Sequence, residues 1–287
     1  MLNKVKYLFI FIHLLIVRNC MSQNQDVIWV IGSINFNGPE AGLSFINDTL
    51  ETIQMDRSMW FFFTNASICD TSGELLFYSN GNYISNRNHD SLMNSFNFNP
   101  GFITDQYWDG LPIPQALIII PKPESKTSYY IFHESANEIF PSTGYDVQPL
   151  NLRLTTVDMQ LDGGLGGIDS NEKNVNIISD TLTLGRITSC KHANGRDWWI
   201  IAHEYYRNTY YKLLVTPDSI IGPYEQKVGV DLKQDIFGQA VFSPDGKWYA
   251  NLGTTDTADL MRFNRCTGEF YDNVMLNIPD SAYVLGC

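Results

Sequence analysis

The chain has 287 residues, of which 44% are hydrophobic and 17% charged, and its formal net charge is −12 at pH 7. This composition is that of a globular protein and excludes a disordered chain. An acidic surface repels phosphate groups, so neither nucleic acid nor an anionic membrane is expected as a partner. Because such a surface attracts cations, calcium is the one cofactor that we consider; no other is expected.

Residues 1–23 have the three parts of a secretory signal peptide. Lys4 and Lys6 precede an apolar run over residues 7–17, and small and polar residues follow. The apolar run is 11 residues long, whereas a helix that spans a bilayer needs about 20. We therefore expect a protein that is secreted or displayed on the cell surface, with no transmembrane segment in the mature chain.

Residues 24–287 are expected to form one all-β domain built from a repeated hairpin. Residues 27–58 hold a set of N-terminal strands. After them, four hairpins share the same order of an apolar strand, a tight turn and a strand rich in aromatic residues. Their turns lie at residues 70–73, near Ser125, at 193–195 and at 243–246, the last within "VFSPDGKWYANLG".

The spacing of the hairpins predicts a β-propeller. Gly195 and Gly246 stand 51 residues apart, and two further strands follow most hairpins, which is typical of four-stranded propeller blades. A β-sandwich also has short, evenly spaced strands and is the alternative. The predicted blades cover about 59–105, 113–182, 186–231 and 236–278. Residues 281–287, "SAYVLGC", read as the start of a further blade, so an incomplete ring is expected.

Several stretches resemble known propellers. "VFSPDGKWYA" resembles the turn of TolB-like and WD-repeat-like propellers, and five further stretches resemble a secreted module of Bacteroidetes-type bacteria: "GPEAGLSF", "DTSGELLFYSNGNYISNRNH", "PQALIIIPKP", "VDMQLDGGLGGI" and "KHANGRDWWIIAHE". The resemblance runs from about Trp29 to Cys287. It implies export as cargo of type IX secretion and a truncated chain without a sorting domain. It implies no activity for any named residue.

No catalytic residue is predicted. The chain has no GxSxG nucleophile elbow and no CxxC pair, and buried free thiols are expected for its cysteines. Cys190 and His192 would share one face of a strand, but an unactivated cysteine is a poor nucleophile. The pair is therefore set aside.

Two His-Glu pairs are the candidates for ligand binding. His133-Glu134 and His203-Glu204 end the second strand of two blades, and His192 lies in the same blade as His203. Together they could bind a metal or a sugar at one end of the ring. Adjacent residues of a strand point to opposite faces, which opposes chelation by one pair. We favour structural histidines that tie loops in place.

Two loops supply the remaining candidates. Tyr107 and Trp108 lie in a polar stretch that could contact a glycan or a peptide, or could be packed on the propeller by its own aromatic rings. Asp162 and Asp169 flank the turn "GGLGG" and could hold Ca²⁺. The function expected from all this is a secreted or cell-surface binding or scaffold module without catalytic activity, with an extracellular glycan or protein as partner. The alternative is an extracellular hydrolase or lyase that uses the central funnel of the ring.

Overall fold

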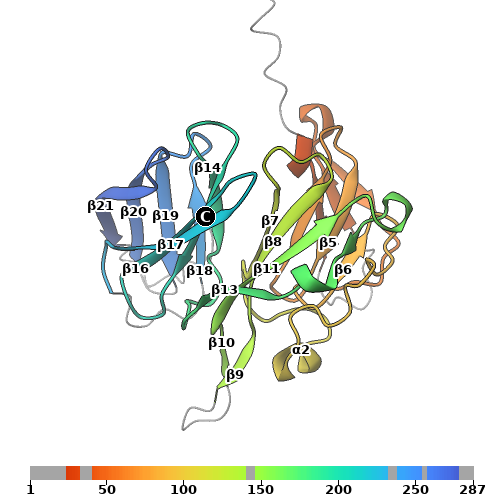
Figure 1. Ribbon diagram of the computed structural model, residues 1–287, viewed down its shortest axis with the longest axis horizontal. Coiled ribbons are helices and arrows are strands. Elements are labelled where there is room, and N and C mark those ends of the chain that lie inside the picture. Colours follow the sequence, from red (N-terminus) through yellow and green to blue (C-terminus); the bar gives the residue numbers. More distant parts are fainter. Residues whose placement is uncertain (1–23, 33–40, 140–145, 232–237, 254–256, 278–287) are drawn as a thin grey trace, which may run out of the picture.

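The computed structural model describes residues 24–32, 41–139, 146–231, 238–253 and 257–277. In these ranges the chain forms antiparallel sheets that stand side by side as the blades of a propeller (Figure 1). The predicted fold class is confirmed, and the described sheets do not close into a ring. The predicted signal peptide, residues 1–23, and the predicted start of a further blade, residues 281–287, lie outside the described residues.

The first two sheets have three strands each. Strands β1 (Ile28–Ile31), β2 (Ala41–Ser44) and β3 (Glu51–Gln54) pair in chain order, as do β4 (Ala66–Cys69), β5 (Leu75–Ser79) and β6 (Ile84–Asn86). The Ser67 hydroxyl on β4 donates to the Ile28 carbonyl on β1 over 2.9 Å, so the sheets are joined near their first strands. Short 3-10 helices flank β1 and β3, over Asn24–Asp26 and Ile46–Asp48.

The third sheet is the largest and carries the main excursions of the chain. It contains β7 (Leu117–Pro121), β8 (Ser128–Glu134), β11 (Asn151–Asp158), β12 (Gly167–Ile168) and β13 (Val175–Ser179). A separate hairpin of β9 (Asn137–Ile139) and β10 (Asp146–Gln148) leaves the end of β8. Helix α2 (Phe102–Gln106) lies on the long connection before β7, and 3-10 helices span Asp162–Gly164 and Ser170–Glu172.

The last two sheets are regular four-stranded blades. One pairs β14 (Thr188–Lys191), β15 (Trp198–His203), β16 (Thr209–Val215) and β17 (Ile220–Lys227) in chain order. The other pairs β18 (Gly238–Phe242), β19 (Trp248–Gly253), β20 (Thr257–Asn264) and β21 (Glu269–Asn277) in the same way.

The paired aromatic residues of the second strands explain how the blades pack. Neighbouring residues of a strand point to opposite faces. Tyr129 accordingly lies in the core between the second and third sheets, and Tyr130 lies in the core between the third and fourth. Trp198 and Trp199 divide in the same way between the two cores that flank the fourth sheet. Both faces of these strands are therefore buried.

The blades have two distinct ends (Figure 1). One, the turn end, carries the tight turns at residues 122–127, 192–197 and 243–247. The other, the loop end, carries α2, β9 and β10. Because β8 and β15 both run from the turn end to the loop end, their last residues, Glu134 and His203, lie at the loop end.

Candidate functional site

Glu134 is the centre of a buried polar group at the loop end. Only 1% of its surface is exposed, and its carboxylate accepts a hydrogen bond of 2.7 Å from the N–H of Gly185 in the neighbouring blade. Burial raises the pKa of this carboxyl well above its ordinary value, while the Gly185 N–H and the nearby charge of Arg186 act in the opposite direction. The carboxyl group is therefore biased towards its protonated form.

Arg186 brings three blades together around Glu134. Its side chain is fully buried, and the chain reaches it through two residues in left-handed conformation, Gly185 at φ +77° and Arg186 itself at φ +67°. A Cβ atom on Gly238, which begins β18, would lie 2.4 Å from the Arg186 Nη2 atom. Glycine at that position is what lets the guanidinium lie against the third of these blades.

Gln115 forms a second contact between blades that are not neighbours, near Arg186. It precedes β7, yet its side-chain amide donates to the Ala240 carbonyl over 2.7 Å and accepts from the Ala240 N–H over 2.8 Å. Ala240 lies in β18, two blades further along the chain. Blades that are not neighbours can meet only near the axis around which they are arranged, so Gln115 and Arg186 lie near that axis.

His133 and His203 are held as neutral side chains. Each is at most 2% exposed, and burial lowers the pKa of each to about 3, with the charges of Arg153 and Arg186 acting in the same direction. His133 Nε2 lies 3.2 Å from the Thr155 hydroxyl. His203 Nδ1 lies 3.0 Å from the hydroxyl of Thr183.

The other ring nitrogen of each histidine is not satisfied in this way. Within the described residues, Nδ1 of His133 and Nε2 of His203 are buried without a hydrogen bond of good geometry, and backbone groups of Glu134 and Arg207 lie close enough to raise the pKa of the respective rings. The loop end therefore holds one neutral imidazole, that of His203, near the carboxyl group of Glu134 and the guanidinium of Arg186, while the imidazole of His133 lies on the opposite face of β8.

The two His-Glu pairs occupy corresponding places but differing environments. The Glu204 side chain is only half-buried, and its recorded hydrogen bonds involve the backbone: its N–H donates to Thr209 and its carbonyl accepts from the Thr183 hydroxyl. Alternation along the strand holds for the first pair, since His133 packs on Phe98 while Glu134 reaches the next blade. The structure thus groups His133, Glu134 and His203 at the loop end, without Glu204 as an equivalent of Glu134.

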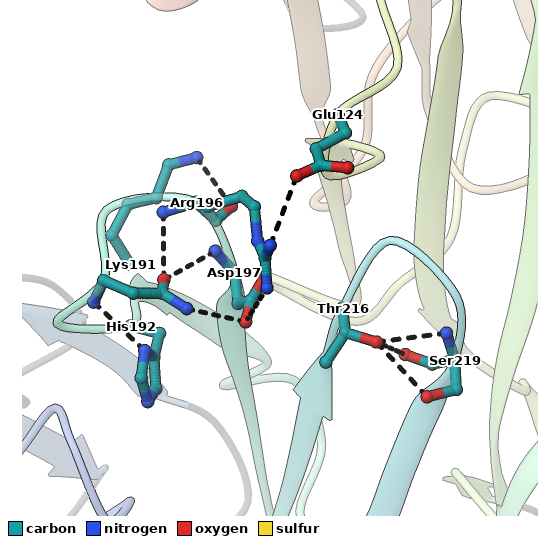
Figure 2. Close-up of polar contacts among 8 residues, drawn as sticks. Glu124, Lys191, His192, Arg196, Asp197, Thr216 and Ser219 are labelled. Carbon is teal, nitrogen blue, oxygen red and sulfur yellow. Dashed lines mark hydrogen bonds and ion pairs between the residues drawn. The ribbon is translucent and has the colours of Figure 1, made fainter.

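His192 lies apart from this group, in the tight turn at the turn end. Its Nε2 is 3.1 Å from the Cys266 carbonyl, and its Nδ1 accepts from the Asn194 N–H over 3.1 Å. Figure 2 shows the polar network of this turn, in which the Arg196 guanidinium lies between Asp197 of its own turn and Glu124 of the neighbouring blade. These contacts give His192 a structural role in joining turns.

A cavity of about 410 Å³ lies at the turn end, between β14 and β18, far along the blades from Glu134. Cys190 lines it, and burial raises the pKa of this thiol to about 11, so the thiol is not activated for attack. Cys190 and Cys69 are buried free thiols, as predicted, and Cys266 is an exposed one.

The remaining candidates lie on loops. Tyr107 is half-buried and its ring lies 5.7 Å from that of Phe62, whereas Trp108 is 64% exposed. The Asp169 carboxylate caps a 3-10 helix by accepting from the Asn171 N–H, and Asp162 is an exposed residue in left-handed conformation. No group of three or more potential metal ligands occurs within the ranges that the structure describes.

Sequence reasoning missed Arg186, Gly185, Gly238 and Gln115. No motif marks these residues. The available signal was that a glycine precedes a long cationic residue directly ahead of the first strand of a blade, a position from which a side chain can reach the axis. Their role became visible only with the contacts between blades.

No family model matches the sequence, and neither does any curated protein. Three solved structures are similar in fold. A protein of unknown function from Desulfotomaculum acetoxidans DSM 771 is 13% identical over 85% of this chain and 66% of its own, with a TM-score of 0.38. The periplasmic gluconolactonase PpgL of Pseudomonas aeruginosa is 11% identical over 83% and 66%, with a TM-score of 0.40. A proposed 6-phosphogluconolactonase of Bacteroides fragilis NCTC 9343 is 8% identical over 89% and 83%, with a TM-score of 0.37.

These comparisons correct the expected function. A binding or scaffold module without catalytic activity was expected, but two of the three structures are enzymes by their descriptions, so the expected alternative, an extracellular hydrolase or lyase, agrees better with these descriptions. The chain spans just under two thirds of the first two proteins, and at such identities the likeness concerns the fold alone. In the described part of the chain, no helix has the length and apolar character to cross a membrane.

Proposed function

We propose that this protein is an extracellular hydrolase that acts at the loop end, with Glu134 as the group that transfers protons. The observation that carries the proposal is the setting of Glu134: a carboxyl group at 1% exposure, beside the fully buried guanidinium of Arg186, whose charge also acts on the neutral His203. Titratable groups whose pKa values burial shifts away from their ordinary values are typical of active sites.

Hydrolysis of an ester or lactone fits these groups. Water adds to the carbonyl carbon, the bond to the leaving oxygen breaks, and one proton passes from the water to that oxygen. A carboxyl group with a raised pKa is protonated near neutral pH and can donate its proton to the leaving oxygen, and the carboxylate that results can take the proton that the attacking water releases. The guanidinium of Arg186 supplies positive charge for the oxygen that becomes negative in the transition state. The net charge of −12 favours an uncharged substrate over a phosphorylated one.

The substrate reaches this group only after a movement of the covering chain. Glu134, Arg186 and the two histidines are each at most 2% exposed. The segment Leu182–Gly185 contacts the carboxylate through the Gly185 N–H. Displacement of this segment would uncover the carboxylate and break that hydrogen bond. Such opening steps often limit turnover in enzymes.

The test is hydrolysis by the purified protein and two variants. Gluconolactone, 6-phosphogluconolactone and p-nitrophenyl acetate serve as first substrates, the two lactones because of the names of the similar structures. Removal of a general acid–base group costs about 10²–10⁴-fold in rate, so Glu134→Gln should lower kcat/KM by at least about a hundredfold. Glu172→Gln, which changes an exposed carboxylate of the same blade, should not alter it. The proposal fails if no substrate is hydrolysed above the uncatalysed rate, or if Glu134→Gln retains full activity.

The extracellular location is part of the same proposal. Its support is the basic, apolar and polar order of residues 1–23. Amino-terminal sequencing of the protein recovered from outside the cytoplasm should begin near Ser22 or Gln23. Recovery of the protein only in the cytoplasm, with residues 1–23 intact, would contradict the location without affecting the assay of Glu134.

A further inference from the structure

Five aromatic side chains form one surface at the loop end, which we call the aromatic platform: Trp60, Phe62, Phe63, Tyr107 and Trp108. Their rings form two groups of contacts, Trp60 with Trp108 and Phe62 with both Phe63 and Tyr107, and the two groups are adjacent because Tyr107 precedes Trp108 in the chain. The ring centroids lie 5.2 Å apart for Trp60 and Trp108, 4.6 Å for Phe62 and Phe63, and 5.7 Å for Phe62 and Tyr107. The rings come from two segments about 45 residues apart in the sequence, so the fold brings them together.

The platform is exposed although the backbone beneath it is fixed. Trp108 is 64% exposed, Phe63 52% and Phe62 38%. The Phe63 and Thr64 N–H groups donate to the Leu111 carbonyl, and the Thr64 hydroxyl donates to the Ile113 carbonyl over 2.6 Å. A fixed backbone that presents large aromatic rings to solvent forms a prepared contact surface, and exposed apolar patches of this kind mark interaction sites.

The chemistry of the platform favours a carbohydrate. The C–H groups on one face of a sugar ring form a flat apolar surface that stacks on an aromatic ring, and aromatic side chains provide that area at a small cost in conformational entropy. Asp105 and Gln106, both exposed, directly precede Tyr107 and supply acceptor and donor groups for hydroxyls. The net charge of −12 opposes acidic glycans, so the fitting ligand is neutral.

We propose that the aromatic platform binds a neutral polysaccharide through Trp108 and Phe63. This inference goes beyond the proposed hydrolase and does not depend on Glu134 being catalytic. The two regions are nevertheless in contact through the core. Tyr107 packs against the buried cluster that contains Leu184, and Leu184 precedes Gly185, the residue bonded to Glu134. A bound polysaccharide would therefore lie beside the segment that covers Glu134.

The test is native gel electrophoresis of the purified protein in gels that contain dextran, galactomannan, xyloglucan or hydroxyethylcellulose. At least one of these neutral polymers should retard the wild-type protein, and Trp108→Ala and Phe63→Ala should weaken the binding at least tenfold. Phe96→Ala is the matched control, because Phe96 lies in the same long connection and is 82% exposed but belongs to none of the ring pairs above. It should bind as the wild type does, as should Glu134→Gln.

The other outcomes overturn the inference. Retardation by none of the four polymers, or equal retardation of all variants, removes the platform as a glycan site. Sedimentation that shows a dimer which Trp108→Ala dissociates would assign the platform to a second copy of the chain. Loss of hydrolysis in Glu134→Gln with unchanged binding in Trp108→Ala would reject the platform and leave the proposed hydrolase standing. Weaker binding in Trp108→Ala together with full hydrolysis in Glu134→Gln would reject the proposed hydrolase and leave the glycan site standing.

Discussion

Replacement of Gly185 by alanine tests the close approach on which the Glu134 site depends. Gly185 has φ +77°, and a Cβ atom there would lie 1.7 Å from the Pro114 carbonyl oxygen. The left-handed conformation costs about 1 kcal/mol for a residue with a Cβ atom. Relief of the overlap requires a shift of the backbone, which adds about 1–3 kcal/mol as in other overpacked sites.

Gly195→Ala is the matched control for this experiment. Gly195 has φ +74°, almost the same conformation, but nothing lies within 4 Å of the position of its Cβ atom. This variant should therefore lose only the conformational term of about 1 kcal/mol. The difference in the free energy of unfolding between Gly185→Ala and Gly195→Ala isolates the overlap with the Pro114 carbonyl. We expect this difference to be about 2 kcal/mol.

The assay is thermal unfolding of both variants at pH 7 in the same buffer. A free-energy change of 1 kcal/mol shifts the Tm of a large domain by about 2–4 °C, so Gly185→Ala should melt about 4–8 °C below Gly195→Ala. If Gly185→Ala melts at the same temperature as Gly195→Ala or above it, the chain at Gly185 does not lie against the Pro114 carbonyl. The description of the loop end around Glu134 would then be wrong.

Two further predictions concern buried side chains. The pKa of His203 is lowered to about 3, so below pH 6.5 the unfolded chain takes up a proton that the folded chain does not, and stability falls as the pH falls towards 3. At pH 5 this amounts to about 2 kcal/mol, and urea unfolding of His203→Gln should lose that much less stability between pH 7 and pH 5 than the wild type; an equal loss would contradict the prediction. Trp199 is 3% exposed and its indole donates to the Arg265 carbonyl, so Trp199→Ala should cost about 3–5 kcal/mol. Trp248→Ala, at a residue 40% exposed, should cost about 1 kcal/mol or less in the same urea titration, and similar midpoints for the two variants would count against the packing described.

The fold was accessible from the sequence because its signals are local. Alternation along a strand and the turn chemistry at residues 243–246 depend on neighbours in the chain, and both repeat from blade to blade. The aromatic residues at 129–130 and 198–199 are also adjacent in the chain, and the structure buries each pair on the two faces of its strand. The expected scaffold function had no such local signal and was corrected by the comparisons.

The candidate site was accessible only in part. His133, Glu134 and His203 could be named from the sequence, because two His-Glu pairs end corresponding strands. Their environments could not, since a pKa depends on burial and on charges that other blades bring close. Glu134 and Glu204 are identical in local pattern, yet only Glu134 meets the Gly185 N–H and the Arg186 charge.

The hairpin of β18 and β19, residues 238–253, shows the same division. Its turn and its strands follow from residues that are adjacent in the chain: the Gly246 N–H donates to the Ser243 carbonyl over 2.7 Å and closes the turn. The local sequence does not determine which residues its first strand contacts, because the hydrogen bonds between Ala240 and Gln115 join positions 125 apart. Strand and turn formation depend on short-range sterics and hydrogen bonds. The assembly of Glu134, Arg186 and Gly238 depends on how three separately formed sheets pack around one axis.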